Sequence, residues 1–224
     1  MPIVFTSAGN PSLFTEKFKK NNMIVVHVVS SSKFAKKAEG AGCDAVVAEG
    51  FEAGGHNGRE ETTTMVLIPL VCDAVKIPVI AAGGIATGRQ MLAAMVLGAE
   101  GVQVGSRFVA SQEASNHINF KTAVTGAKEG DTLVTLKVLT PVRMMKNNFF
   151  REVEAAEDIC AGKEELKKLL GKGRAKKGMF EGDLENGELE IGQVSAGIKN
   201  ILPAADIVTE IWNEFNACLK QPVK

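Results

Sequence analysis

The segment PVIAAGGIATGRQMLAAMVLGAEGVQVGSRF, from Pro78 to Phe108, contains two strand-like runs separated by a helix-like run. The strand-like parts, PVIAAGG and EGVQVGSRF, are short, apolar and rich in β-branched residues. Strands that are nearly continuous in apolar residues are typical of parallel sheets covered by helices on both faces. The segment therefore predicts consecutive βα units of an α/β fold.

Upstream, the same alternation recurs, with strand-like runs at Ile3–Gly9, Met23–Val29 and Asp44–Gly50. Five βα units result, whereas a closed barrel of this type has eight. We therefore expect an α/β fold that is a partial TIM (β/α)8 barrel with right-handed connections. A five-stranded open sheet would expose strand edges and apolar side chains. We accordingly expect a homo-oligomer, or a chain that lacks part of the barrel.

After about residue 110 the βα rhythm stops. A charged, helix-like stretch, EELKKLLGKGRAKKGMFEGD, lies in the middle of the next 80 residues or so. We expect residues 1–110 to form the barrel part and residues 111–190 to form an inserted, mainly helical lobe or lid. Residues 191–224 carry apolar residues at helical spacing, which predicts a helical segment packed on the barrel.

Composition excludes several classes of protein. Lys and Arg total 26 and Asp and Glu total 26 in 224 residues, so no net charge points to nucleic acid or to an anionic membrane. No apolar run approaches the roughly 18 residues of a membrane span. The four cysteines, Cys43, Cys72, Cys160 and Cys218, stand singly, which indicates neither a metal site nor a disulfide framework. We expect a cytoplasmic protein without a metal.

Glycine and small polar residues follow the strand-like runs directly. Gly83 and Gly84 end one run, and Gly105 and Ser106 end the next. Ligands of α/β folds bind at the carboxyl ends of the strands, and late loops of a barrel often hold a phosphate. Each pair by itself also fits an ordinary βα turn. Together they favour a phosphate-binding site.

A third loop, EGFEAGGHNGRE (Glu49–Glu60), places His56 among glycines. An imidazole there can act as an acid or a base near neutral pH. The alternative is a surface histidine in a glycine turn. We interpret His27, inside an apolar run, and His117 as structural residues. The basic stretch GKGRAKKG (Gly171–Gly178) is interpreted as a solvated loop that could touch an acidic partner.

Four stretches, VVAEGFEAGGHNG, PVIAAGGI, GVQVGSRF and FEGDLENGELEIGQVSAGI, resemble the FMN-dependent nitronate monooxygenases, formerly 2-nitropropane dioxygenases. They also resemble the closely related flavin-type enoyl-acyl carrier protein reductases. The resemblance covers nearly the whole chain and implies that His56 is catalytic. It also implies a set of FMN-binding residues: Glu49, Gly54, Gly55, Gly83, Gly84, Gln103, Gly105 and Ser106.

The resemblance implies two activities and leaves both open. An enoyl-acyl carrier protein reductase of fatty-acid synthesis uses NADH or NADPH to reduce an acyl-carrier-bound substrate. A nitronate monooxygenase oxidises small nitroalkanes or nitronates with O₂. Many nitronate monooxygenases have glutamine where this chain has Glu49, which favours the reductase. The resemblance also implies a missing amino-terminal part of the barrel, because family members begin with roughly three further βα units, given the eight of a full barrel. A non-catalytic fragment or partner subunit is therefore a third alternative.

Overall fold

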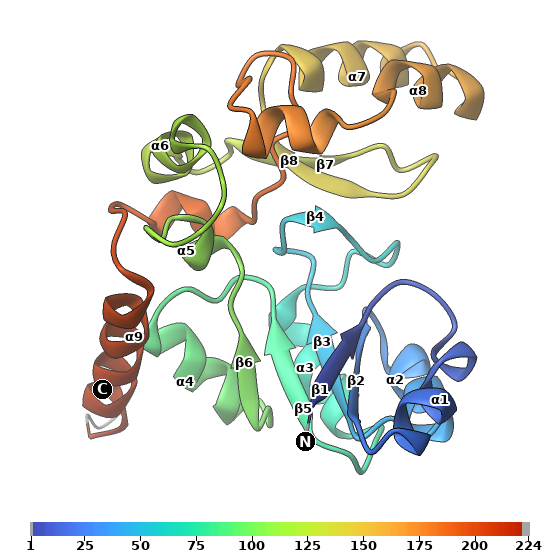
Figure 1. Cartoon of the computed structure of the whole chain (residues 1–224), viewed down its shortest axis with the longest axis vertical. Coiled ribbons are helices and arrows are strands. Elements are labelled where there is room, and N and C mark those ends of the chain that lie inside the picture. The colour runs from blue at the N-terminus through green and yellow to red at the C-terminus, as the bar shows by residue number, and fades with distance from the viewer. Residues whose placement is uncertain (1, 221–224) are drawn as a thin grey trace.

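The computed structural model describes residues 2–220. Its main body is one parallel sheet with the strand order β1-β2-β3-β5-β6. The strands are β1 (Ile3–Thr6), β2 (Ile24–Val29), β3 (Ala45–Glu49), β5 (Val79–Ala82) and β6 (Gly101–Gln103). The sheet curls as in part of a barrel, and helices follow its strands (Figure 1). The predicted fold class, a partial (β/α)8 barrel, is confirmed.

A helix follows each strand of the parallel sheet. These helices are α1 (Thr15–Lys20), preceded by a 3₁₀ turn at Pro11–Leu13, α2 (Ser32–Gly40), α3 (Thr64–Cys72), α4 (Gly88–Val96) and the short α5 (Ser106–Val109). Side chains begin two of them: Ser31 accepts a hydrogen bond from the Phe34 N–H, and Thr87 accepts one from the Gln90 N–H. Such caps satisfy backbone groups that have no partner inside the helix.

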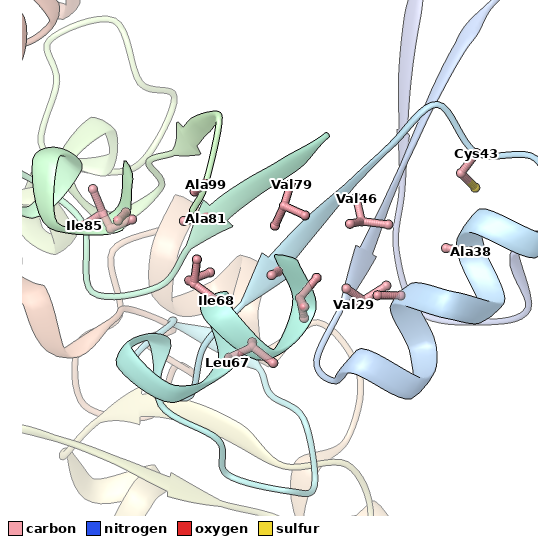
Figure 2. Close-up of a cluster of buried hydrophobic side chains, with 14 of the residues drawn as sticks. Val29, Ala38, Cys43, Val46, Leu67, Ile68, Val79, Ala81, Ile85 and Ala99 are labelled. Carbon is pink, nitrogen blue, oxygen red and sulfur yellow. The ribbon is translucent and has the colours of Figure 1, made fainter. Parts of the chain in front are cut away.

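The core lies between the sheet and its helices (Figure 2). Val46 on β3 and Val79 on β5 pack there with Leu67 and Ile68 of α3. Because side chains alternate along a strand, the neighbouring residues Ala45 and Val47 point to the opposite face. Glu49 has the same parity as those two residues. Its side chain therefore belongs to the inner face of the curled sheet, at the carboxyl end of β3.

A lobe stands over the carboxyl ends of the strands (Figure 1). It contains α6 (Ile118–Gly126), β7 (Thr132–Thr135), β8 (Val142–Met145), α7 (Asn148–Asp158), α8 (Lys163–Leu170) and a π-helical turn, η2 (Lys176–Phe180). The β7–β8 hairpin was not predicted from the sequence. It is completed by β4 (Gly55–His56), a strand from the histidine loop, in an antiparallel sheet of order β4-β8-β7.

The chain then returns to the barrel through a 3₁₀ turn, η3 (Gln193–Gly197), and ends in α9 (Ala204–Leu219). Helix α9 packs on α4 so closely that a β-carbon at Gly88 would overlap the Phe215 backbone nitrogen. Glu214 accepts a hydrogen bond from the Gly88 N–H at 2.7 Å and pairs with Arg89 at 2.9 Å. Within residues 2–220, no helix is both long and apolar enough to cross a membrane.

Candidate active site

Two cavities adjoin the carboxyl ends of the strands. The first, called the glycine cavity, has a volume of about 210 Å³. The strand-end loops and the segment before η3 enclose it, with Glu49, Glu52, Ala53, Gly54, Ala82, Gly83, Gly84, Ile85, Gln103, Gly105, Ser106, Val109, Met179, Glu190, Ile191 and Val194 as lining residues.

Backbone geometry explains the glycines after β5. Gly83 and Gly84 have φ angles of 90° and 70°, which residues other than glycine adopt only at an energetic cost. A β-carbon at Gly83 would also lie 2.8 Å from the Gly50 carbonyl oxygen. The Thr64 hydroxyl oxygen also lies close to this turn, 3.0 Å from the Gly83 carbonyl oxygen. The loop therefore presents backbone, and no side chains, to the cavity.

Gly105 serves a different purpose. A β-carbon there would meet nothing within 4 Å, so packing within the protein does not require glycine. The backbone N–H groups of Gly84, Gly105 and Ser106 donate to no other group among residues 2–220. The Ser106 hydroxyl accepts a hydrogen bond from the Gly192 N–H at 3.0 Å. Free N–H donors beside open space suit an anionic group.

Glu52 has a structural partner. Its carboxylate accepts hydrogen bonds from the Thr64 backbone N–H at 2.9 Å and from the Thr64 hydroxyl at 2.9 Å. Thr64 is the first residue of α3, whose own N-cap residue makes no side-chain bond. Glu52 therefore caps α3 from the histidine loop and holds that loop against the sheet.

The histidine loop is held between the barrel and the lobe. A β-carbon at Gly54 would overlap the Ile191 backbone, and the Gln193 N–H donates to the Glu52 carbonyl at 2.9 Å. Gly55 has a φ of 77°, and the Glu190 carboxylate lies directly against it. The glycines of this loop therefore permit close approach of the segment at 190–193.

Arg143 of β8 ties the lobe to this loop. Its side chain is 1% exposed and donates to the Phe51 carbonyl oxygen at 2.9 Å through Nη2 and at 3.2 Å through Nε. The guanidinium also lies over the Phe51 ring, 4.6 Å from its centre. Burial lowers the pKa of Arg143, and the nearby charges of Glu52 and Glu61 oppose that shift. An arginine so placed fixes the loop that leads to His56.

The second cavity, called the histidine cavity, has a volume of about 230 Å³. His56 of β4 lines it, together with Glu49, Asn57 and Thr140 among others. The His56 side chain is exposed, whereas Asn57 beside it is 9% exposed. Asn57 donates to the carbonyls of Ala53 and Gly55 at 2.9 and 3.1 Å. Asn57 thus fixes the turn, while the His56 ring remains free to meet a ligand.

Glu49 lines both cavities. Burial raises its pKa to about 7, and no hydrogen bond or ion pair to its carboxyl is formed within the described part of the chain. Burial likewise raises the pKa of Glu190, against the opposing effect of His56. Burial and the neighbouring Glu190 raise the pKa of Glu188 to about 7. Glu49 can therefore carry a proton near neutral pH where the two cavities meet.

The structure brings seven predicted residues together in the glycine cavity: Glu49, Gly54, Gly83, Gly84, Gln103, Gly105 and Ser106. Gly55 lies behind them against Glu190, and His56 lies in the adjoining cavity. Sequence reasoning did not single out Glu190, Met179 or Arg143. The stretch GELEIGQVSAGI does carry Glu190, and its alternating carboxyls between apolar residues are the signal that could have marked it.

The other residues singled out in the sequence have local partners. His117 begins α6, where its Nδ1 accepts a hydrogen bond from the Asn119 N–H at 3.1 Å. His27 is 6% exposed, and its Nδ1 is 2.7 Å from the Thr6 hydroxyl. In the basic loop, Arg174 donates to the carbonyls of Leu169 and Asn186.

Comparison with known proteins identifies related sequences. The model of the nitronate monooxygenase family matches residues 1–214. A probable nitronate monooxygenase of Staphylococcus saprophyticus is 39% identical over 170 residues, covering 70% of this chain and 48% of that protein. One from Staphylococcus aureus strain MSSA476 is 35% identical over 233 residues, covering 98% of this chain and 64% of that protein. The chain thus spans about half to two thirds of the length of these relatives.

Two solved structures have the same fold over 98% of this chain. FabK from Thermotoga maritima is 42% identical with a TM-score of 0.92, and 69% of its chain is covered. A nitroalkane oxidase from Streptomyces ansochromogenes is 27% identical with a TM-score of 0.82, and 65% of its chain is covered.

Proposed function

The chain belongs to the nitronate monooxygenase family, and we propose that it carries the FMN site of an oxidoreductase that reduces enoyl thioesters with NADH or NADPH. The observation that carries the proposal is the position of Glu49, which lines both the glycine cavity and the histidine cavity. A carboxyl there faces the cofactor on one side and the substrate on the other.

The glycine cavity fits FMN in its chemistry. Backbone N–H groups of Gly84, Gly105 and Ser106 are free to hold the phosphate, and Gly105 leaves room for it. The carboxyls of the cavity would oppose an anion if all were charged. Glu52 is bound to Thr64, and the raised pKa values of Glu49 and Glu190 favour their neutral forms. FMN, when bound, supplies the hydride chemistry that no side chain of this chain can supply.

The chain itself contributes a proton. Reduction of a carbon–carbon double bond adds a hydride to the β-carbon and a proton to the α-carbon. Glu49, with a pKa of about 7, holds a transferable proton near neutral pH. His56, exposed in the same cavity, is the second group that can give or take one.

Nitronate oxidation is the second candidate function. The curated relatives, at 35% and 39% identity, are named probable nitronate monooxygenases. The exposed imidazole of His56 could remove the acidic α-proton of a small nitroalkane. The greater identity to FabK, 42% against 27% for the nitroalkane oxidase, favours the reductase.

One set of measurements separates these functions. The purified protein, supplied with FMN, is reduced with NADH without oxygen and then assayed with a crotonyl thioester and with 2-nitropropane. We expect retained flavin absorbance, bleaching by NADH, and turnover of the thioester. Turnover of 2-nitropropane alone would assign the monooxygenase. Failure to retain flavin would identify the chain as a non-catalytic partner or as a part that needs the rest of a barrel.

A further inference from the structure

A further cavity lies in the lobe, at the basic loop Gly171–Gly178. It has a volume of about 500 Å³ and is called the basic cavity. Its lining residues are Lys172, Gly173, Arg174, Lys176, Lys177 and Glu181, so cations predominate. The glycine cavity, in contrast, has no Lys or Arg among its described lining residues.

Arg174 is held in a fixed position at this cavity. Its guanidinium donates hydrogen bonds to the carbonyl oxygens of Leu170 at 3.2 Å, Leu169 at 3.1 Å and Asn186 at 2.8 Å. It also lies over the Phe149 ring, 4.6 Å from its centre. A guanidinium has five N–H donors, so these bonds leave donors free for a ligand. An arginine that is held in place and keeps free donors is suited to a phosphate group.

The lysines of the cavity differ in their partners. Lys176 pairs with Glu181 at 3.1 Å, and Lys177 pairs with Asp183 at 2.9 Å. Lys172 is exposed and forms no ion pair within the described part of the chain. Because both acidic side chains are already paired, the cavity keeps a net positive charge from Lys172 and the arginine. An anion that enters it would meet these two cations without first displacing a carboxylate.

The π-helical turn η2 connects the basic cavity with the glycine cavity. It carries Lys176 and Lys177, which line the basic cavity, and Met179, which lines the glycine cavity. Gly178 between them is buried, and a β-carbon there would lie 2.6 Å from the Glu188 carbonyl oxygen. The turn is therefore packed tightly against its support. The residues that line the two cavities are about one helical turn apart along the chain.

From this arrangement we propose that the basic cavity binds a phosphate group of a ligand whose reactive end lies at the glycine cavity beside Met179. The inference rests on the proposed reductase function, for which two ligands carry phosphate: the nicotinamide dinucleotide and the acyl thioester. The dinucleotide is favoured, because only a ribose separates its pyrophosphate from the nicotinamide ring that must reach the flavin. In the thioester, a whole pantetheine arm separates the phosphate from the reacting carbon.

Calorimetry with inorganic pyrophosphate and with ADP tests the proposal without requiring turnover. The titrations use the purified chain, with FMN present and absent, at low and at moderate salt. We expect both probes to bind and their affinity to fall as salt rises, since the contacts are between charged groups near the surface. If neither probe binds at low salt, the cavity is not a phosphate site.

Lys172→Glu is the decisive variant. The lysine is exposed and has no ion-pair partner among residues 2–220, so reversal of its charge should not disturb folding. We expect ADP to bind roughly tenfold more weakly, as for the loss of a charge-assisted contact. The KM for NADH should rise by a similar factor, whereas kcat and the KM for a crotonyl thioester should stay the same. Lys163→Glu, at an exposed lysine that begins α8, is the matched control and should change none of these values.

The outcomes separate the phosphate site from the function. Unchanged binding of both probes in Lys172→Glu, or an equal loss in Lys163→Glu, would overturn the site even if NADH reduces the flavin. Weaker binding of butanoyl-coenzyme A in Lys172→Glu, with unchanged binding of NADH, would overturn the dinucleotide assignment and give the phosphate to the thioester. Weaker ADP binding in Lys172→Glu, without reduction of FMN by NADH in any variant, would support the site and count against the reductase.

Discussion

Glu49 is a buried ionisable residue, so its protonation affects the free energy of unfolding. Its pKa in the folded protein is about 7, above the ordinary value of 4.5. Between these values the folded chain binds more protons than the unfolded chain. The free energy of unfolding must then fall as pH rises from about 5 to 7, by on the order of 1 kcal/mol per pH unit for each such group.

Glu49→Gln should therefore flatten part of this pH dependence. The remaining pH dependence should come from Glu188, whose pKa is also raised to about 7. Urea unfolding of both proteins at pH 5 and pH 7.5 provides the measurement, with Glu154→Gln, at an exposed carboxyl of α7, as control. If Glu49→Gln and the unsubstituted chain lose the same stability over this interval, the carboxyl is not held in its protonated form.

His56 is the residue for which we expect the largest kinetic effect. His56→Ala should lower turnover by roughly 10²–10⁴ while flavin stays bound, if the imidazole gives or takes a proton. The loss would be smaller if Glu49 alone supplies the proton. Steady-state rates per bound flavin are the readout. His117→Asn is the control, because asparagine can keep the cap of α6. Unchanged turnover with both substrate classes would make His56 a surface residue of a glycine turn.

At the level of elements, the loop between β6 and α5 tests flavin binding. Gly105→Val would place its side chain in the open space beside the free N–H groups, where no protein atom lies within 4 Å of the β-carbon. We expect the fold to survive and flavin retention to be lost, as measured by absorbance after gel filtration. Gly162→Val is the control: its β-carbon also has open space, but it lies at the start of α8. Stoichiometric flavin in Gly105→Val would exclude this loop as the phosphate site.

Elements differ in how far the sequence predicts them. The central strands of the parallel sheet are apolar on both faces, so a continuous run such as Ala45–Ala48 reveals them directly. The β7–β8 hairpin escapes prediction because its register is fixed by β4 and by the burial of Arg143, which come from tertiary contacts. The strand-end glycines are visible in sequence, whereas Glu190 reaches the site only through the contact of residues 190–193 with Gly54 and Gly55.

For the whole molecule, the open sheet predicts association. Among residues 2–220, β1 and β6 each pair with one neighbour only. Ile3 and Phe5 on β1 are 58% and 53% exposed. Unpaired strands with apolar side chains favour pairing with another chain. We expect light scattering to give a mass above that of a monomer, and Phe5→Lys to reduce it. A stable monomer that unfolds cooperatively would show that the edge strands of this sheet do not need to pair with another chain.

Because β4 pairs with β8, the candidate site is formed by two parts of the molecule. The barrel loops present the glycine cavity, and the lobe holds the strand that carries His56. Mutations in the lobe can therefore reposition the imidazole without touching the glycine loops. The strand-end loops and the lobe can in this way diverge separately in sequence.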